Sequence, residues 1–99
     1  MSPAIHVDHR ALARFCRQNG IRRLAVFGSA LRDDFGPDSD VDLLVEFEPG
    51  TRMGLIGLSR VEIDLSELLG RQADLNTPNG LHRRFRDRVL AEAQVLYVA

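Results

Sequence analysis

The 99-residue sequence contains no lysine, no tryptophan and only one cysteine, and its apolar runs are all short. A membrane-spanning helix needs about 20 consecutive apolar residues, so no such helix is expected. The single cysteine, Cys16, excludes an intrachain disulfide and favours a reducing, cytoplasmic location. The net charge of −1 gives no general attraction to nucleic acids or membranes. We therefore expect neither direct nucleic-acid binding nor membrane binding.

Length and composition indicate one small globular domain covering residues 1–99. The sequence is 44% hydrophobic and 27% charged, which is typical of ordinary soluble domains. A chain of this size buries roughly 60–70% of its unfolded surface, enough for one modest core. The first residues, Met1 to His6, lack the basic and apolar segments of a secretory signal.

Apolar periodicity predicts helices and strands that alternate along the chain. A first helix follows Asp8, a suitable N-cap, and carries Leu12, Phe15 and Cys16 on one stripe up to Gly20. Further helices are predicted at 30–32, 55–69 and 81–93, a turn at 36–39, and strands at 24–27, 41–47, 72–77 and, as an edge, 95–98. This order predicts an α/β (α+β) fold: a small mixed β-sheet with helices packed mainly on one face.

The last predicted helix combines an apolar stripe with many charges. Leu81, Phe85, Val89 and Leu90 (or Ala93) are expected to face inward. The basic residues in 82–88 form either a solvated face or a surface for a protein partner. The apolar edge at 95–98 would also allow the chain to assemble with itself or with its target.

Two aspartates at the start of a strand are the first chemical signal. Asp40 and Asp42 alternate with Val41, so both carboxylates project from the same face, about 6.6 Å apart along the chain. Two carboxylates this close repel unless a cation lies between them or one is protonated. Hard oxygen ligands of this kind favour Mg²⁺ together with substrate phosphates, and the sequence therefore predicts a divalent-metal site.

A glycine and a serine end the preceding strand. Gly28 lacks a side chain and so lets a phosphate approach the backbone, while Ser29 offers a hydroxyl and amide donors at the start of a helical segment. Arg32, one turn later, is a further candidate phosphate ligand. The short connection to the next strand would bring this anion site beside Asp40 and Asp42.

A third carboxylate, Asp74, lies in the following predicted strand between Ala73 and Leu75, where a lone acid would be costly to bury. We expect Asp74 to join Asp40 and Asp42 as a metal ligand around two ions. It would also act on the attacking hydroxyl, either by lowering the pKa of that hydroxyl or by taking its proton as a general base.

These residues resemble the signature of the DNA polymerase β nucleotidyltransferase superfamily, and most closely its minimal (MNT) members. The similarity rests on Gly28-Ser29, the ten-residue gap, Asp40-x-Asp42 and Asp74, and it extends to the runs at 68–75 and 93–97. One departure is that Leu31-Arg32-Asp33 stands where many members have Ala-Arg-Gly, with Asp34 next.

The resemblance implies a polymerase β-like fold and the antitoxin of a HEPN/MNT toxin–antitoxin pair. Such a protein would transfer AMP from ATP, with Mg²⁺ as cofactor, to a tyrosine of the HEPN toxin. Gly28 and Ser29 would contact the triphosphate, and Asp40, Asp42 and Asp74 would bind metal. Two alternatives stay open: a non-catalytic antitoxin that covers the toxin's active site, and an enzyme that modifies a small molecule.

Overall fold

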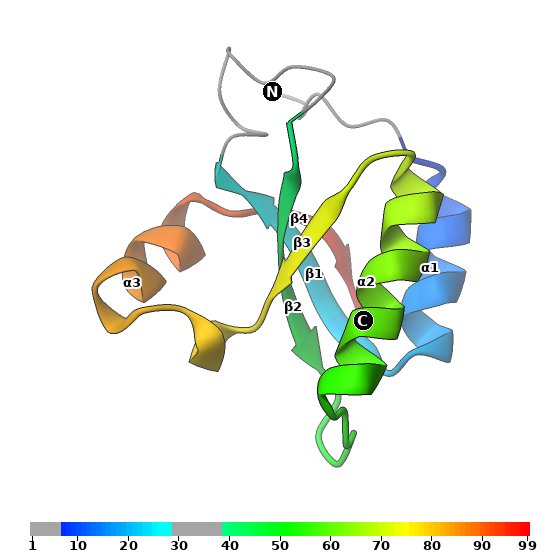
Figure 1. The fold of residues 1–99 in the computed structure, drawn as a ribbon, viewed down its shortest axis with the longest axis horizontal. Helices are drawn as coiled ribbons and strands as arrows, with labels where there is room; N and C mark the ends of the chain where they lie inside the picture. The colour runs from blue at the N-terminus through cyan, green and yellow to red at the C-terminus, as the bar shows by residue number, and fades with distance from the viewer. Residues whose placement is uncertain (1–6, 29–38) are drawn as a thin grey trace.

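A computed structural model describes residues 7–28 and 39–99 and contains a four-stranded mixed sheet in the order β3-β2-β1-β4. The strands are β1 (Ile21–Phe27), β2 (Val41–Phe47), β3 (Ala73–Asn76) and β4 (Gln94–Val98), and the helices are α1 (His9–Gln18), α2 (Leu55–Leu69), α3 (Arg83–Glu92) and a 3₁₀ helix at Pro78–Gly80. β1 pairs antiparallel with β2 and β4, whereas β2 and β3 are parallel. Helices α1 and α2 cover one face and α3 lies on the other side (Figure 1). The predicted fold class is confirmed.

The beginning of the chain folds as the local sequence predicts. The Asp8 side chain caps α1 by accepting hydrogen bonds from the amides of Arg10 (2.9 Å) and Ala11 (3.4 Å). Leu12 and Cys16, one turn apart, are fully buried against the sheet. The predicted helical turn at 30–32 and the turn residues 36–38 lie outside the described part of the chain.

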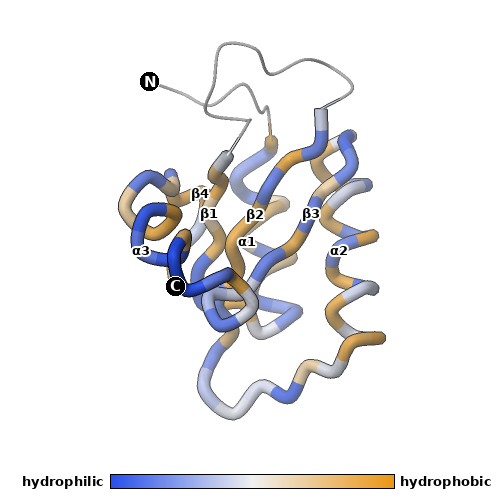
Figure 2. The backbone as a smooth tube through the Cα atoms, turned by 60° about the vertical axis from the view of Figure 1, so that its left-hand side comes forward, coloured by the Kyte–Doolittle hydropathy of each residue, from blue (hydrophilic) through white to orange (hydrophobic). Residues whose placement is uncertain are grey.

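The core lies between the sheet and the pair α1 and α2. Along β2, Val41, Leu43 and Val45 are fully buried on one face. On the other face Leu44 is buried as well, whereas Asp42 and Glu46 are only partly buried. Leu24 and Val26 of β1 and Val61, Leu65 and Leu69 of α2 complete the layer. The hydropathy of the residues agrees with this position of the core, because α3, which lies outside it, carries mostly hydrophilic residues (Figure 2). Ala25 and Leu44 are buried in the middle of the opposite face, so that only the Asp42 end of this face stays accessible.

Two sequence predictions need correction. β1 begins three residues earlier than predicted: Ile21 is buried and pairs with Phe47, and Arg23 faces Glu46 on β2 at 3.6 Å. Phe85 and Leu90 of α3 do not face inward: they are 59% and 36% exposed, and none of the α3 residues is buried. This helix lies beside the sheet without packing closely on it, so its apolar residues stay partly or fully exposed.

None of the helices in the described ranges combines the length and the apolar character that a bilayer-spanning helix requires.

Cys16 yields a test of the core. Burial raises the pKa of this thiol from 9.0 to about 11, against a small opposing effect of Arg17. The folded state therefore holds the thiol proton more tightly than the unfolded state does. The contribution of this protonated thiol to stability is complete below about pH 9 and is lost as the pH approaches 11. Because the chain has no lysine, few other groups titrate in this range.

We expect the free energy of unfolding, measured by chemical denaturation, to fall by roughly 2 kcal/mol between pH 8 and pH 11. In Cys16→Ala most of this fall should disappear, although the variant is less stable at every pH. An equal fall in both proteins would show that Cys16 is not the titrating group.

Candidate functional site

The acidic residues and the glycine meet at one end of the sheet, where β2 and β3 begin and β1 ends (Figure 1). Asp42 lies opposite Phe27 of β1 on one side and opposite Asp74 of β3 on the other. Register partners project from the same face, and neighbouring strands are about 4.8 Å apart. Asp42 and Asp74 are therefore neighbours on the sheet face that α1 and α2 leave open.

Gly28 is in direct contact with Asp42. Its φ of +72° belongs to the left-handed region, which favours glycine. A Cβ placed on Gly28 would collide with Oδ2 of Asp42 and would come within 3.3 Å of its Cγ. The missing side chain thus provides both the backbone turn and the space that the carboxylate occupies. The two halves of the sequence motif form one structural unit.

Asp74 is held in place by α2. The amide of Ala73 donates to Oγ of Ser66 (2.9 Å), and the amide of Leu75 donates to Oε2 of Glu62 (2.8 Å). These two bonds give hydrogen-bond partners to the backbone amides on both sides of Asp74, which the edge strand β3 would otherwise leave unpaired. Asp74 itself is exposed, so the expected cost of burying it between apolar neighbours does not arise. Strand alternation instead turns Ala73 and Leu75 into the core and Asp74 outward.

Asp40 directly precedes β2 and is exposed. Its surroundings are tied to β3 by two contacts. The amide of Val41 donates to the carbonyl of Gln72 (2.9 Å), and the Arg71 guanidinium donates to the carbonyl of Ser39 (3.4 Å). The starts of the two acid-bearing strands are therefore cross-linked to each other, which limits their relative movement.

The donor chemistry of this end of the sheet suits a divalent cation. Within residues 7–28 and 39–99, no three acidic, histidine or cysteine side chains form a ready-made group that encloses an ion. Mg²⁺, however, is usually bound by one or two carboxylates together with water and substrate phosphates. Neighbouring carboxylates also repel each other in the absence of a cation. The Asp42 and Asp74 pair thus matches a site that is completed by its substrate.

Two of the predicted phosphate ligands, Ser29 and Arg32, lie outside the described residues, and their roles stay predictions. In the other direction, sequence reasoning missed Glu62, Ser66 and Arg71 as positioning residues. A signal was present: Glu62 and Ser66 stand one helical turn apart, and each directly follows a buried residue, Val61 and Leu65 respectively.

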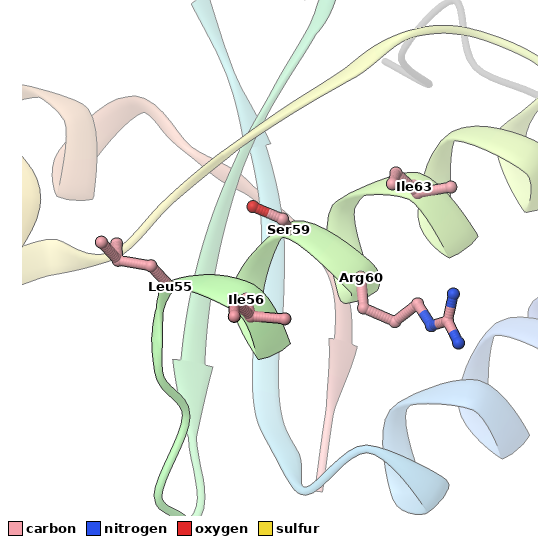
Figure 3. Close-up of a pocket in the computed structure, with 5 residues that line it drawn as sticks. All are labelled: Leu55, Ile56, Ser59, Arg60 and Ile63. Carbon is pink, nitrogen blue, oxygen red and sulfur yellow. The ribbon is translucent and has the colours of Figure 1, made fainter.

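Several hollows open on the surface of the described part of the chain, and two of them bear on function. One, of about 360 Å³, lies between the Gly28 end of β1 and helix α3, and is lined by Phe27, Gly28, Leu81, Phe85, Arg88, Val89 and Glu92. The other, of about 560 Å³, lies along α2, and Figure 3 shows Leu55, Ile56, Ser59, Arg60 and Ile63 around it. Leu55 and Ile56 are more than 80% exposed there. The first hollow adjoins the glycine, whereas the second is a separate surface.

The sequence profile of the nucleotidyltransferase domain family matches residues 9–96. The candidate protein adenylyltransferase MJ0435 of Methanocaldococcus jannaschii is 40% identical over 76 residues, which cover 77% of this chain and 80% of the relative. Protein adenylyltransferase MntA of Thermococcus cleftensis is 39% identical over 79 residues, covering 80% of this chain and 76% of that protein.

Solved structures share the fold. A candidate minimal nucleotidyltransferase has 40% sequence identity and a TM-score of 0.70, with 86% of this chain and 85% of that one covered. A toxin–antitoxin complex with AMP-PNP gives a TM-score of 0.73 at 17% identity (94% and 75% covered). A tri-AMPylated HEPN toxin of Shewanella oneidensis with its MNT antitoxin gives 0.64 at 17% identity (92% and 70% covered). At such low identity the last two are similar in fold alone.

Proposed function

The chain belongs to the nucleotidyltransferase domain family, and on that premise we propose that it is a protein adenylyltransferase. It transfers AMP from ATP to a tyrosine hydroxyl of a HEPN-domain toxin and thereby acts as the antitoxin. The observation that carries this proposal is the contact of Gly28 with Asp42, with Asp74 in register on the next strand. The relative MntA carries the name of this activity, and the MNT antitoxin of similar fold is bound to an AMPylated HEPN toxin.

The residues divide into three roles. Asp40, Asp42 and Asp74 would hold Mg²⁺, which when bound neutralises the triphosphate and orients it for in-line displacement. Gly28 and Ser29 would take the triphosphate against the backbone, and Arg32 would add a guanidinium to it. Glu62 and Ser66 keep the backbone on both sides of Asp74 fixed, so that its carboxylate needs little reorganisation.

The transfer step needs one proton acceptor, and we assign this role to Asp74. It takes the proton of the tyrosine hydroxyl as the phenolic oxygen forms a bond to the α-phosphorus of ATP. The bond between the α-phosphorus and the bridging oxygen breaks, and pyrophosphate leaves with that electron pair. Since Asp74 lies on the edge strand β3 and is exposed, a protein side chain has access to it.

Cys16 supports a proposal about the cell compartment. This buried, unpaired thiol suits a reducing environment, so we propose that the protein acts in the cytoplasm, where ATP is available.

The decisive experiment mixes the chain with Mg²⁺, ATP and the HEPN-domain protein encoded beside it. ATP labelled at the α-phosphate should label the partner, ATP labelled at the γ-phosphate should not, and pyrophosphate should be released. Mass spectrometry of the partner should find AMP on tyrosine. Label from the γ-phosphate would instead indicate a kinase and would contradict the proposal.

A double variant separates catalysis from simple covering of the toxin. Asp40→Asn with Asp42→Asn should lose both label transfer and inhibition of the toxin's activity. A double variant that still inhibits fully would favour a non-catalytic antitoxin. Ile63→Ala, on the exposed side of α2, serves as the matched control and should keep both activities.

A further inference from the structure

We infer that the hollow between Gly28 and α3 is a nucleoside pocket, in which the base of the bound triphosphate packs against Phe85. This inference rests on the proposed function, because it assumes that the triphosphate lies at Gly28. It adds a ligand-binding role for helix α3, to which the catalytic motif assigns none.

The pocket continues directly from the proposed phosphate site. Gly28 belongs to its lining, and Phe27 before it shares the sheet face of Asp42. Leu81, Phe85 and Val89 supply apolar walls from the α3 region. Its volume of about 360 Å³ is within the range of small-molecule pockets. If the phosphates of a nucleotide lie at Gly28, the apolar space next to them is therefore available for its nucleoside.

The exposure of Phe85 indicates that the folded chain alone does not bury this ring. Phe85 is 59% exposed and sits beside the His82 ring, with their centroids 5.7 Å apart. His82 is itself fixed, because its Nδ1 accepts a hydrogen bond from the Arg84 amide (3.1 Å). The Phe85 ring is thus presented at the edge of the pocket, where a planar base can stack on it.

Polar groups at the rim match the edge of a base. Nε of Arg88 donates to Oε1 of Glu92 at 3.1 Å, one helical turn apart, and both residues line the pocket. A nucleobase presents hydrogen-bond donors and acceptors side by side along its edge. A guanidinium and a carboxylate held next to each other supply the complementary acceptors and donors.

The strand order favours the base over the tyrosine acceptor as the occupant. Across the sheet, Asp74 on β3 is followed by Asp42 on β2 and then by the end of β1, where Phe27 and Gly28 line the pocket. The pocket and Asp74 are therefore separated by two strand spacings, or about 9.6 Å. A hydroxyl that gives its proton to Asp74 arrives from the β3 side, which leaves the opposite side for the nucleoside.

The test compares ATP with inorganic tripolyphosphate, a probe that has the phosphates but no base. Dissociation constants are measured by calorimetry with Mg²⁺ for wild type, Phe85→Ala, Val89→Trp and the control Ile63→Ala. Removing the Phe85 ring should weaken ATP about 5- to 100-fold, as for base stacking in other proteins, and Val89→Trp should weaken it by filling the pocket. Tripolyphosphate affinity should change less than about twofold in each variant.

The outcomes separate this inference from the proposed function. If wild type transfers AMP but both pocket variants bind ATP normally, the inference is wrong and the adenylyltransferase proposal stands. Normal ATP binding combined with a raised KM for the HEPN protein would assign the pocket to the acceptor and would also overturn it. Because Phe85 is exposed, its removal should leave folding intact, which a thermal melt of each variant checks.

Discussion

Gly28→Ala is expected to lower kcat/KM for AMP transfer by about 100-fold or more, because the new methyl group displaces the Asp42 carboxylate. A displacement of about 1 Å in a catalytic group is enough for an effect of this size. The same change forces alanine into a left-handed conformation, which costs roughly 1–2 kcal/mol of stability. Steady-state kinetics on folded protein, with an unfolding curve for each variant, measure the two effects separately.

Gly50→Ala is the matched control. Gly50 also has a positive φ, +88°, but a Cβ there meets no atom within 4 Å. It follows β2, at the opposite end of that strand from Asp42. The control should therefore lose similar stability and keep its activity. If both variants kept activity, or lost it equally, the contact between Gly28 and Asp42 would have no special role.

Asp74→Asn should reduce transfer by about 1,000-fold while ATP still binds, since a positioned general base contributes about 10²- to 10⁴-fold. Asp42→Asn, in contrast, should weaken binding of ATP with Mg²⁺ as well as transfer, because it removes the carboxylate that lies between Gly28 and Asp74. Calorimetry and the α-label assay on the same preparations make the comparison. Because Asp74 is exposed, the free energy of unfolding of the Asp74→Asn variant should differ from that of wild type by less than about 0.5 kcal/mol.

Equal loss of ATP binding in the two variants would contradict the assignment of Asp74 to the acceptor hydroxyl. It would instead make Asp74 a ligand of the nucleotide-bound metal alone. Transfer that persists in Asp74→Asn would require another proton acceptor in the site.

Much of the fold could be predicted from local pattern. The strand at Val41–Phe47 and the helix at Leu55–Leu69 have the predicted bounds, because apolar periodicity and clear stop signals such as Gly70 define both. The Asp8 cap was likewise visible from residue type and position. These features depend on neighbours in sequence, and that is the information a single chain provides.

What could not be predicted depends on distant partners. Arg23 joins β1 because Glu46 of β2 lies beside it, and no local rule reveals that pairing. The burial of the α3 stripe depends on how much sheet remains to be covered on that side, so Phe85 was wrongly expected to face the core. The bounds of short elements shift for the same reason.

For the site, the sequence indicated which residues take part but not the contacts that hold them in place. Sequence alone indicated that Gly28, Asp42 and Asp74 belong together, and the register of the three strands brings them to one end of the sheet. The collision that excludes a side chain at Gly28 emerged only in three dimensions. So did the two bonds from α2 that hold β3 around Asp74.

The central claim is that Asp42 and Asp74 act on one divalent ion beside a triphosphate at Gly28. A crystal structure with Mn²⁺ and a non-hydrolysable ATP analogue tests it most directly, through the anomalous signal of the metal. We expect a peak within about 2.5 Å of oxygen atoms from both carboxylates and of a phosphate oxygen, with the phosphates against Gly28. A metal bound elsewhere, or a nucleotide bound away from Gly28, would contradict the claim.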